Sequence, residues 1–426
     1  MGGCIFLALS CFASVTSAKT TTLSPGDALA EIITAAEDGD VVVLPKGRWQ
    51  GPITITSSIV LRNEGGVITG NDKGTVVRVD APRVRLENLQ VEYSGDDLRG
   101  PDSCIYLTPK STGSVVIGNE LTHCTFGIWI HETHDVELIN NRISGKPGAH
   151  STELGNGIQL FDGENLTIRG NYVTKTRDGI YVSATEKSLI ENNITEYVRY
   201  GIHYMFSYYN TIQGNISEHN KNGYALMESL HLTVRDNIAR YNKEHGLLFR
   251  DAQYCKIYDN YLESNGEGLF FFSSTNNEIR NNVVKNNTVG AKIWAGSVRN
   301  TVSGNHFIGN QRQIFYVSTK DLDWGEEGEG NYWSDYMGWD QDKDGVGERA
   351  YRVDSFTSNL IHRFPNAVLL LRSPVLELLG HLQERMPALK VPTVIDHAPL
   401  MHPPALNTSA ASKKGSPVSL SKEDAS

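Results

Sequence analysis

Gly201-Ile202-His203-Tyr204 is one copy of the pattern that decides the fold, a glycine followed by an apolar-x-apolar strand. The pattern also begins at Gly179 and at Gly223, 22 residues away on either side. Further copies begin at Gly127, Gly157, Gly246, Gly268 and Gly290. A unit of this length is too short for a propeller blade, and it lacks the helical periodicity of ankyrin or TPR pairs. We therefore expect at least two short alternating strands per unit, separated by glycine and asparagine turns and repeated along one axis.

Asparagine repeats in step with the glycine. The chain has 32 asparagines and nine glutamines, so the excess is not general polarity. One series consists of Asn119, Asn141, Asn171, Asn193, Asn215, Asn237, Asn260, Asn282 and Asn305. Asparagine tolerates left-handed backbone at turns, and amides repeated once per unit can hydrogen-bond along the axis. The sequence therefore predicts an all-β fold, a right-handed parallel β-helix with coils of about 22 residues stacked about 4.8 Å apart.

The two ends of the chain differ from the repeats. Residues 1–18 lack charge and are typical of a secretory signal peptide cleaved after Ala18, which predicts export. Within the β-helix, assigned to 19–320, the segment from Pro25 to Gly39 predicts a capping helix with Asp27 as N-cap and Gly39 as its stop. An acidic and aromatic block follows at 321–365, then an amphipathic helix at 366–390 and a disordered tail at 391–426.

Charge and cysteine content exclude some functions. The net charge of −10 argues against a nucleic-acid partner, because such proteins usually carry a basic stripe. After cleavage of the signal peptide the cysteines are Cys104, Cys124 and Cys255, an odd number whose spacing matches no zinc motif. We interpret all three as buried or inactive thiols and expect no redox pair.

The residues after each repeat glycine suggest a candidate copper site. The first and third should point into the β-helix, and the second and fourth should face outward. On that outward face Met205 and Met227 fall in register, with His203 two residues from Met205. Thioether and imidazole groups suit copper, especially Cu(I). The alternative is a hydrophobic methionine contact beside a surface histidine. A weaker cluster of soft ligands in the tail contains His397, Met401 and His402.

A second metal is suggested by the acidic loop that follows the repeats. Asp340, Asp342 and Asp344 alternate, and Gly345 occupies the sixth position, as in the first half of an EF-hand loop. The twelfth position is Tyr351, which excludes the complete EF-hand. A shorter calcium loop that orders the C-terminal region is one hypothesis, and an uncomplexed acidic turn is the other.

Many β-helices act on polysaccharides, so an enzyme of that class is the alternative function. The repeats show no Gly-His-Gly and no Asp-Pro-His, and Asp96-Asp97 is an isolated acidic pair. Paired carboxylates for glycosidic acid–base chemistry are not displayed in any column of the outward face. The residues therefore favour a protein without catalytic activity.

The block from Gly330 to Asp340, with its continuation through Gly347, is the most distinctive part of the sequence. Together with the repeats it resembles the NosD family, exported β-helical accessory proteins of nitrous oxide reductase maturation. The resemblance covers roughly Pro25 to Met386, and the aromatic stretch from Tyr204 to Tyr209 is also similar. It implies a periplasmic protein that works with the ATPase and membrane subunit of an ABC transporter. It also implies that copper arrives from a lipoprotein chaperone and goes to the copper centres of nitrous oxide reductase.

Overall fold

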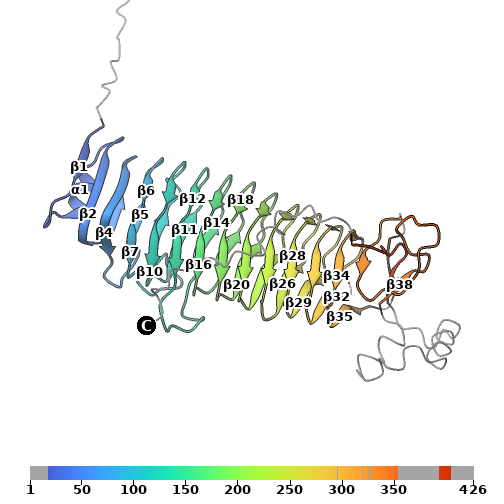
Figure 1. The fold of residues 1–426 in the computed structure, drawn as a ribbon. Helices are drawn as coiled ribbons and strands as arrows, with labels where there is room; N and C mark the ends of the chain where they lie inside the picture. Colours follow the sequence, from blue (N-terminus) through green and yellow to red (C-terminus); the bar gives the residue numbers. More distant parts are fainter. Residues whose placement is uncertain (1–17, 295, 319, 326–327, 354–392, 404–426) are drawn as a thin grey trace, which may run out of the picture.

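The computed structural model describes residues 18–294, 296–318, 320–325, 328–353 and 393–403. These residues form an elongated stack of parallel β-coils, with the N-terminal strands at one end and the C-terminal strands at the other (Figure 1). The expected all-β parallel fold is confirmed. The signal peptide at 1–18, apart from Ala18, and the helix at 366–390 lie outside the described residues.

The repeat pattern forms a sheet of twelve parallel strands, one from each successive coil. Residues one and three after each glycine point inward, as expected: Ile202 and Tyr204 have no exposed surface. The strands are, in order, β3 (Ile53–Ile55), β5 (Val77–Val79), β8 (Ser103–Leu107), β11 (Phe126–His131), β14 (Ile158–Phe161), β17 (Ile180–Ser183), β20 (Tyr200–Met205), β23 (Asn222–Met227), β26 (His245–Arg250), β29 (Glu267–Phe272), β32 (Val289–Trp294) and β35 (Arg312–Val317).

The remaining strands of the coils form a 24-stranded sheet. It begins with β1 (Thr20–Thr22), β2 (Val41–Gln50) and β4 (Val60–Thr69), and β4 pairs with the first strand of both stacks that follow. One stack contains β6 (Arg85–Glu87), β9 (Val115–Ile117), β12 (Glu137–Ile139), β15 (Thr167–Arg169), β18 (Leu189–Glu191), β21 (Thr211–Gln213), β24 (Thr233–Arg235), β27 (Lys256–Tyr258), β30 (Glu278–Arg280) and β33 (Thr301–Ser303). The other contains β7 (Gln90–Glu92), β10 (Glu120–Thr122), β13 (Arg142–Ser144), β16 (Tyr172–Thr174), β19 (Ile194–Glu196), β22 (Ile216–Glu218), β25 (Ile238–Arg240), β28 (Tyr261–Glu263), β31 (Val283–Lys285), β34 (His306–Ile308) and β37 (Tyr332–Trp333).

The repeat glycines are required by close packing and not by turns. Gly201 and Gly223 lie inside strands β20 and β23, and neither has a positive φ. A Cβ added to Gly201 would lie 2.7 Å from the carbonyl oxygen of Gly223, and one added to Gly223 would lie 2.4 Å from that of Gly246. Real Cβ atoms essentially never come this close, so the stacked coils leave no room for a side chain here.

The asparagine series forms a continuous hydrogen-bonded ladder along the β-helix. At a typical rung, Asn193 donates from its backbone N–H and its side-chain amide to Oδ1 of Asn215, at 2.9 and 3.0 Å. The ladder asparagines do not themselves adopt left-handed backbone; the residue before each does, as at Asn192 with φ of 54°. A second ladder, which the sequence analysis did not separate, contains Asn220, Asn242, Asn265, Asn287 and Asn310.

The N-terminal end is covered by helix α1 (Leu29–Ala35), shorter than the predicted helix. Leu29 and Ile33 bury its apolar side in the core. Asp27 does not cap it, because the Asp27 carboxylate accepts the backbone N–H of Ser24 at 2.7 Å. The helix also ends before Gly39, with Ala36 as its C-cap. The Asp27 side chain therefore stabilises the turn before the helix and not the N-terminus of the helix.

The C-terminal end is closed by a three-stranded sheet. Its strands are β36 (Leu322–Trp324), β38 (Tyr351–Arg352) and the central β39 (Val394–Asp396). Strand β39 lies in the segment that the sequence analysis assigned to a disordered tail, so that assignment does not hold for residues 393–403. The reason is Asp396, which is completely buried and accepts hydrogen bonds from Asn331 and Trp333. Asp396 therefore forms the last rung of the main asparagine ladder.

Two of the three cysteines in the described residues form a disulfide, which corrects the expectation of three free thiols. Cys104 and Cys124 are buried and bonded, with their Cα atoms 5.6 Å apart. Their separation of 20 residues is close to one coil, so stacking brings them together on adjacent turns. Cys255 is free and buried, as expected, and burial raises the pKa of its thiol to about 11.

Candidate functional site

The candidate copper ligands lie on adjacent strands of the twelve-stranded sheet. His203 and Met205 are on β20, and Met227 on β23 pairs directly with Met205, so the register expected from the sequence is present. Alternate residues of a strand lie about 6.6 Å apart and neighbouring strands about 4.8 Å apart, within the reach of flexible methionine side chains. His203 is opposite Ala225, whose small side chain leaves the neighbouring position without a bulky group.

His203 is buried, although its position in the strand faces outward. Only 6% of the residue is exposed, because the rings of Tyr181 and Tyr200 lie against the imidazole with centroids at 5.0 and 4.6 Å. Nδ1 lies 3.0 Å from Oδ2 of Asp178, while Nε2 is buried and has no hydrogen-bond partner among the residues that the structure describes. A buried imidazole nitrogen without a partner is costly, and a bound ligand would remove that cost.

Asp178, which precedes the glycine of the previous coil, forms a buried ion pair beside His203. Arg199 donates from Nε to Oδ1 at 2.8 Å and from Nη2 to Oδ2 at 2.7 Å. Burial by itself would raise the pKa of Asp178, but hydrogen bonds from Arg199 and His203 outweigh it and hold that pKa below its ordinary value. The carboxylate is therefore an ionised acceptor in contact with one nitrogen of the candidate ligand.

Both methionines pack in a small apolar cluster on this face. Met227 is buried with Ala225 and Leu248, and the half-buried Met205 packs against the same cluster. The apolar surroundings fit either of the two interpretations of the sequence, a hydrophobic contact or a soft-ligand site. The histidine, by contrast, is not the surface residue of the first interpretation.

The weaker candidate ligands of the tail are not gathered into a comparable site. Nε2 of His397 lies 2.9 Å from Oδ1 of Asp323 on β36, so this imidazole already has a partner. The backbone N–H of Met401 donates to the carbonyl of Gly345 at 2.9 Å, which fixes the tail against the acidic loop. His402 is exposed.

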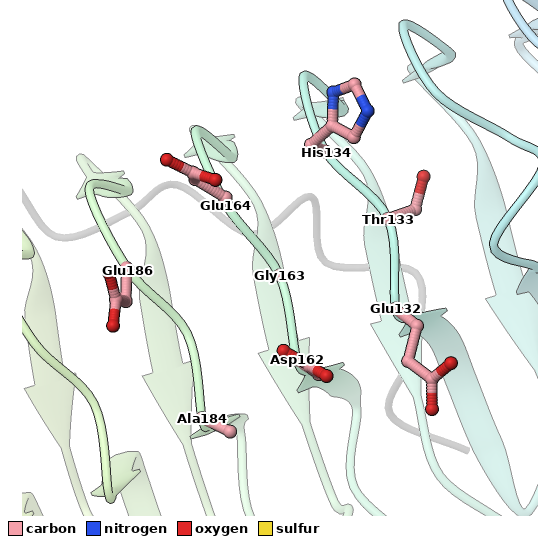
Figure 2. Close-up of a pocket in the computed structure, with 8 residues that line it drawn as sticks. All are labelled: Glu132, Thr133, His134, Asp162, Gly163, Glu164, Ala184 and Glu186. Atoms are coloured by element: carbon pink, nitrogen blue, oxygen red, sulfur yellow. The ribbon is translucent and has the colours of Figure 1, made fainter.

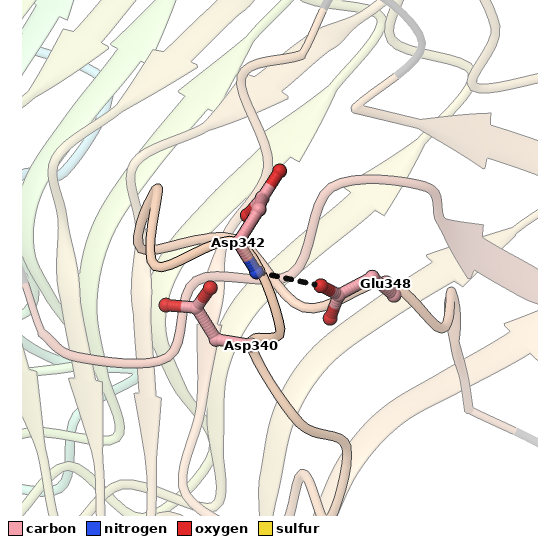
Figure 3. A group of neighbouring side chains, drawn as sticks. All are labelled: Asp340, Asp342 and Glu348. Atoms are coloured by element: carbon pink, nitrogen blue, oxygen red, sulfur yellow. Dashed lines mark hydrogen bonds between the residues drawn. The ribbon is translucent and has the colours of Figure 1, made fainter.

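The acidic loop brings three carboxylates together, but not the three expected. Oxygens of Asp340, Asp342 and Glu348 lie within 4.8 Å of one another (Figure 3). Oδ1 of Asp344 instead accepts the backbone N–H of Val346 at 2.7 Å. Glu348 lies at the ninth position of the loop, which is also a ligand position in EF-hands, so the loop spacing could have identified it. Its Oε1 accepts the N–H of Asp342 at 3.3 Å.

An acidic hollow of about 310 Å³ lies beside the turns that follow strands β11, β14 and β17. Glu132 and Asp162 occupy the fifth position after the repeat glycine, and His134, Glu164 and Glu186 occupy the seventh (Figure 2). These two columns continue the period of the repeat glycines beyond the strands, and that period is the signal by which they could have been found. The carboxylates that line the hollow give this part of the surface a negative charge.

Two stacks of aromatic rings flank strands β20, β23 and β26. Before the strands, His219 stacks between Tyr197 and Tyr241, with centroids 5.7 and 5.3 Å away. After the strands, His231 stacks in the same way between Tyr209 and Tyr254, at 4.9 and 5.3 Å. All six residues have positive φ, a conformation that bulky residues rarely adopt, and the four tyrosines are at least half exposed. These stacks were not predicted, because their residues recur in turns and not in the strand columns.

Comparison with known families agrees with this architecture. Residues 139–338 match the family model described as "Periplasmic copper-binding protein (NosD)". Residues 50–187 match the model of a right-handed β-helix region, which gives the hand of the coils. Among solved structures, the A-module of mannuronan C-5 epimerase AlgE4 from Azotobacter vinelandii is similar, with a TM-score of 0.53 and 16% identity over 68% of this chain and 93% of that one. At this identity the likeness shows the fold alone.

Two curated relatives match over most of their length. Each is named "Probable ABC transporter binding protein NosD", one from Pseudomonas aeruginosa (strain PAO1) and one from Stutzerimonas stutzeri. Each is 41% identical to this chain over 377 residues, which is 85% of this chain and 88% or 86% of the relative. Within the described residues no helix is long and apolar enough to cross a membrane. With this identity and coverage, the chain belongs to the NosD family of periplasmic proteins.

Proposed function

We propose that this chain is a non-catalytic periplasmic assembly factor that works with an ABC transporter and holds copper for nitrous oxide reductase at His203, Met205 and Met227. The observation that carries the proposal is the buried Nε2 of His203, which has no hydrogen-bond partner in the described part of the chain, on the strand that also bears Met205. Family membership supports it, because the family model describes a copper-binding protein and the relatives are named as transporter binding proteins.

The ligand set suits Cu(I) as a cargo that must later be released. One neutral imidazole and two thioethers add no negative charge, and soft ligands favour Cu(I) over the hard cations of the periplasm. The two methionines have flexible side chains, so they can move toward or away from the ion without disturbing the strands. The apolar cluster around Met227 would keep water from the ion while it is held.

A Cu(I) titration under anaerobic conditions, with a competing chromophoric chelator, tests the site. Met205→Leu and Met227→Leu keep the apolar volume of the cluster and remove only the sulfur. We expect each to weaken binding at least about tenfold, or about 1.4 kcal/mol. Met337→Leu is the matched control, because Met337 is 76% exposed in the C-terminal block. If the two cluster variants bind Cu(I) as tightly as the wild type and the control, copper does not bind at these methionines.

The exposed tyrosine stacks support a role in docking. Tyrosine is enriched at the centres of protein interfaces, and here Tyr197, Tyr209, Tyr241 and Tyr254 lie exposed in the turns before and after strands β20 and β26. We propose as partners nitrous oxide reductase, the ATPase and membrane subunits of the transporter, and a copper chaperone lipoprotein. Affinity purification of the tagged chain from denitrifying cells should recover the reductase and the transporter subunits. Their absence, with the tagged chain folded and exported, would contradict the proposed partners.

The acidic loop is proposed as a calcium site that orders the C-terminal block. Asp340, Asp342 and Glu348 supply hard oxygen ligands close enough for one ion. We expect calcium to raise the melting temperature and a chelator to reverse the effect, and Asp342→Asn should abolish the response. Asp344→Asn is the control, because its carboxylate is outside the cluster. A melting temperature indifferent to calcium would show that the loop is an uncomplexed acidic turn.

A further inference from the structure

The hydrogen bond between Asp178 and His203 determines which imidazole nitrogen can bind a ligand. An ionised carboxylate only accepts hydrogen bonds, and Nδ1 lies 3.0 Å from Oδ2 of Asp178, so Nδ1 must carry the proton. The neutral ring then has its lone pair on Nε2. That nitrogen is buried and has no hydrogen-bond partner among the described residues.

The carboxylate is itself fixed from a second side. Arg199 binds both of its oxygens, at 2.8 and 2.7 Å, and the fork geometry of the guanidinium allows little rotation of the carboxylate. The Arg199 guanidinium in turn lies over the ring of Tyr200, 4.8 Å from its centroid. Tyr200 also packs against His203. Three neighbouring groups thus hold one imidazole in one orientation.

A second carboxylate–histidine pair on the same face shows what is specific to this one. His245 Nδ1 lies 2.8 Å from Oε2 of Glu267, and Lys292 binds Oε1 of the same carboxylate at 2.7 Å. His245 stacks on Phe270, and it precedes the repeat glycine instead of following it. Its strand, β26, carries no methionine. The Glu267 pair therefore offers a comparison that lacks the soft ligands, and its two contacting atoms do not meet hydrogen-bond geometry.

We propose that Asp178, fixed by Arg199, is a positioning residue that presents Nε2 of His203 to copper. This inference rests on the copper site proposed above. A metal-bound histidine usually donates its other N–H to a carboxylate, and loss of that partner typically weakens metal binding by about 10–100-fold.

The tautomer of His203 can be read without any metal. Nitrogen-15 NMR of histidine-labelled, copper-free protein should show a protonated Nδ1 and an unprotonated Nε2, with the signal assigned by its loss in His203→Gln. A protonated Nε2 in the wild type would overturn the inference. This measurement needs no variant that alters Asp178, so it stands even if such a variant fails to fold.

Copper titration then separates the positioning role from the site itself. We expect Asp178→Asn to change the His203 tautomer and to weaken Cu(I) binding about 10–100-fold. Asp178→Glu should restore part of both, and the control Glu267→Gln should change neither. If the His203 and methionine variants have no effect, the proposed copper site fails. If they weaken binding and a folded Asp178→Asn does not, the site stands and the positioning role is refuted.

Discussion

Asp396 provides the sharpest test of how the ladder stabilises the C-terminal end. Its Oδ2 accepts the backbone N–H of Asn331 at 2.8 Å, the side-chain amide of Asn331 at 3.1 Å and the indole N–H of Trp333 at 2.9 Å. Asp396→Ala would leave these three donors buried and unpaired, at about 1–3 kcal/mol each. Because coils contact only their neighbours, we expect the loss to appear as local opening of the last coils.

The expected loss of local stability determines which assay is suitable. A local loss of at least about 3 kcal/mol corresponds to exchange of the Asn331 amide hydrogen about 100-fold faster than in the wild type. Hydrogen exchange read by mass spectrometry measures this, with peptides from β20 as an internal reference. Emission of Trp333, which stacks on Phe307 and Tyr351, provides an independent signal.

A matched variant makes the test specific for the acceptor. Asp396→Asn keeps one side-chain oxygen that can accept the ladder hydrogen bonds, as the asparagine of every interior rung does. Its amide NH2 group would replace Oδ1, which in the wild type accepts the backbone N–H of Ala398 at 3.2 Å. We expect it to lose about one hydrogen bond, roughly 1 kcal/mol. Unchanged exchange in Asp396→Ala would refute the reasoning, and so would equal losses in the two variants.

Three further predictions concern the disulfide, a buried histidine and a repeat glycine. Replacing both Cys104 and Cys124 by serine removes a cross-link over 20 residues and should lower the free energy of unfolding by about 3 kcal/mol, as measured by urea denaturation. Burial lowers the pKa of His306 to about 4, so the unfolded chain binds more protons between that value and about 6.5. Stability should therefore fall as the pH drops through this window, and the slope should shrink in His306→Gln. Gly223→Ala places a Cβ 2.4 Å from the carbonyl oxygen of Gly246 and should lower the free energy of unfolding by about 1–3 kcal/mol, the range of overpacked core variants, which a lower melting temperature would reveal.

The fold could be predicted from the sequence because single residue types, glycine and asparagine, recur with the period of the coils. The repeat glycine, as at Gly201, and the ladder asparagine, as at Asn215, each recur at a fixed position in successive coils. Each of these two positions has one structural requirement. The structural requirement that each of these residues meets was harder to predict than its position. Gly223 is needed for close approach between strands and not for a turn, and the left-handed residue is Asn192, not the ladder residue Asn193. One-dimensional patterns locate such residues but do not show which neighbour restricts them.

The candidate site was only partly visible in the sequence. Met205 and Met227 could be aligned because they occupy one column, and the structure places them side by side. The partner of His203 is Asp178, which is on another coil and in a different column, so no single periodicity connects the two. Asp396 is a further case, since it lies 65 residues from Asn331, whose backbone N–H it accepts.

The pairing of β38 with β39 has a mechanical consequence. Val353 and Thr393 border the residues outside the described structure, and the N–H of Val353 donates to the carbonyl of Val394 at 3.1 Å. Strands β38 and β39 are thus joined to each other, and Asp396 lies two residues beyond that bond. A force that separates β38 from β39 would therefore load the final rung of the ladder first. The other coils would receive the load only through that rung, so the C-terminal coil would open before the rest of the β-helix.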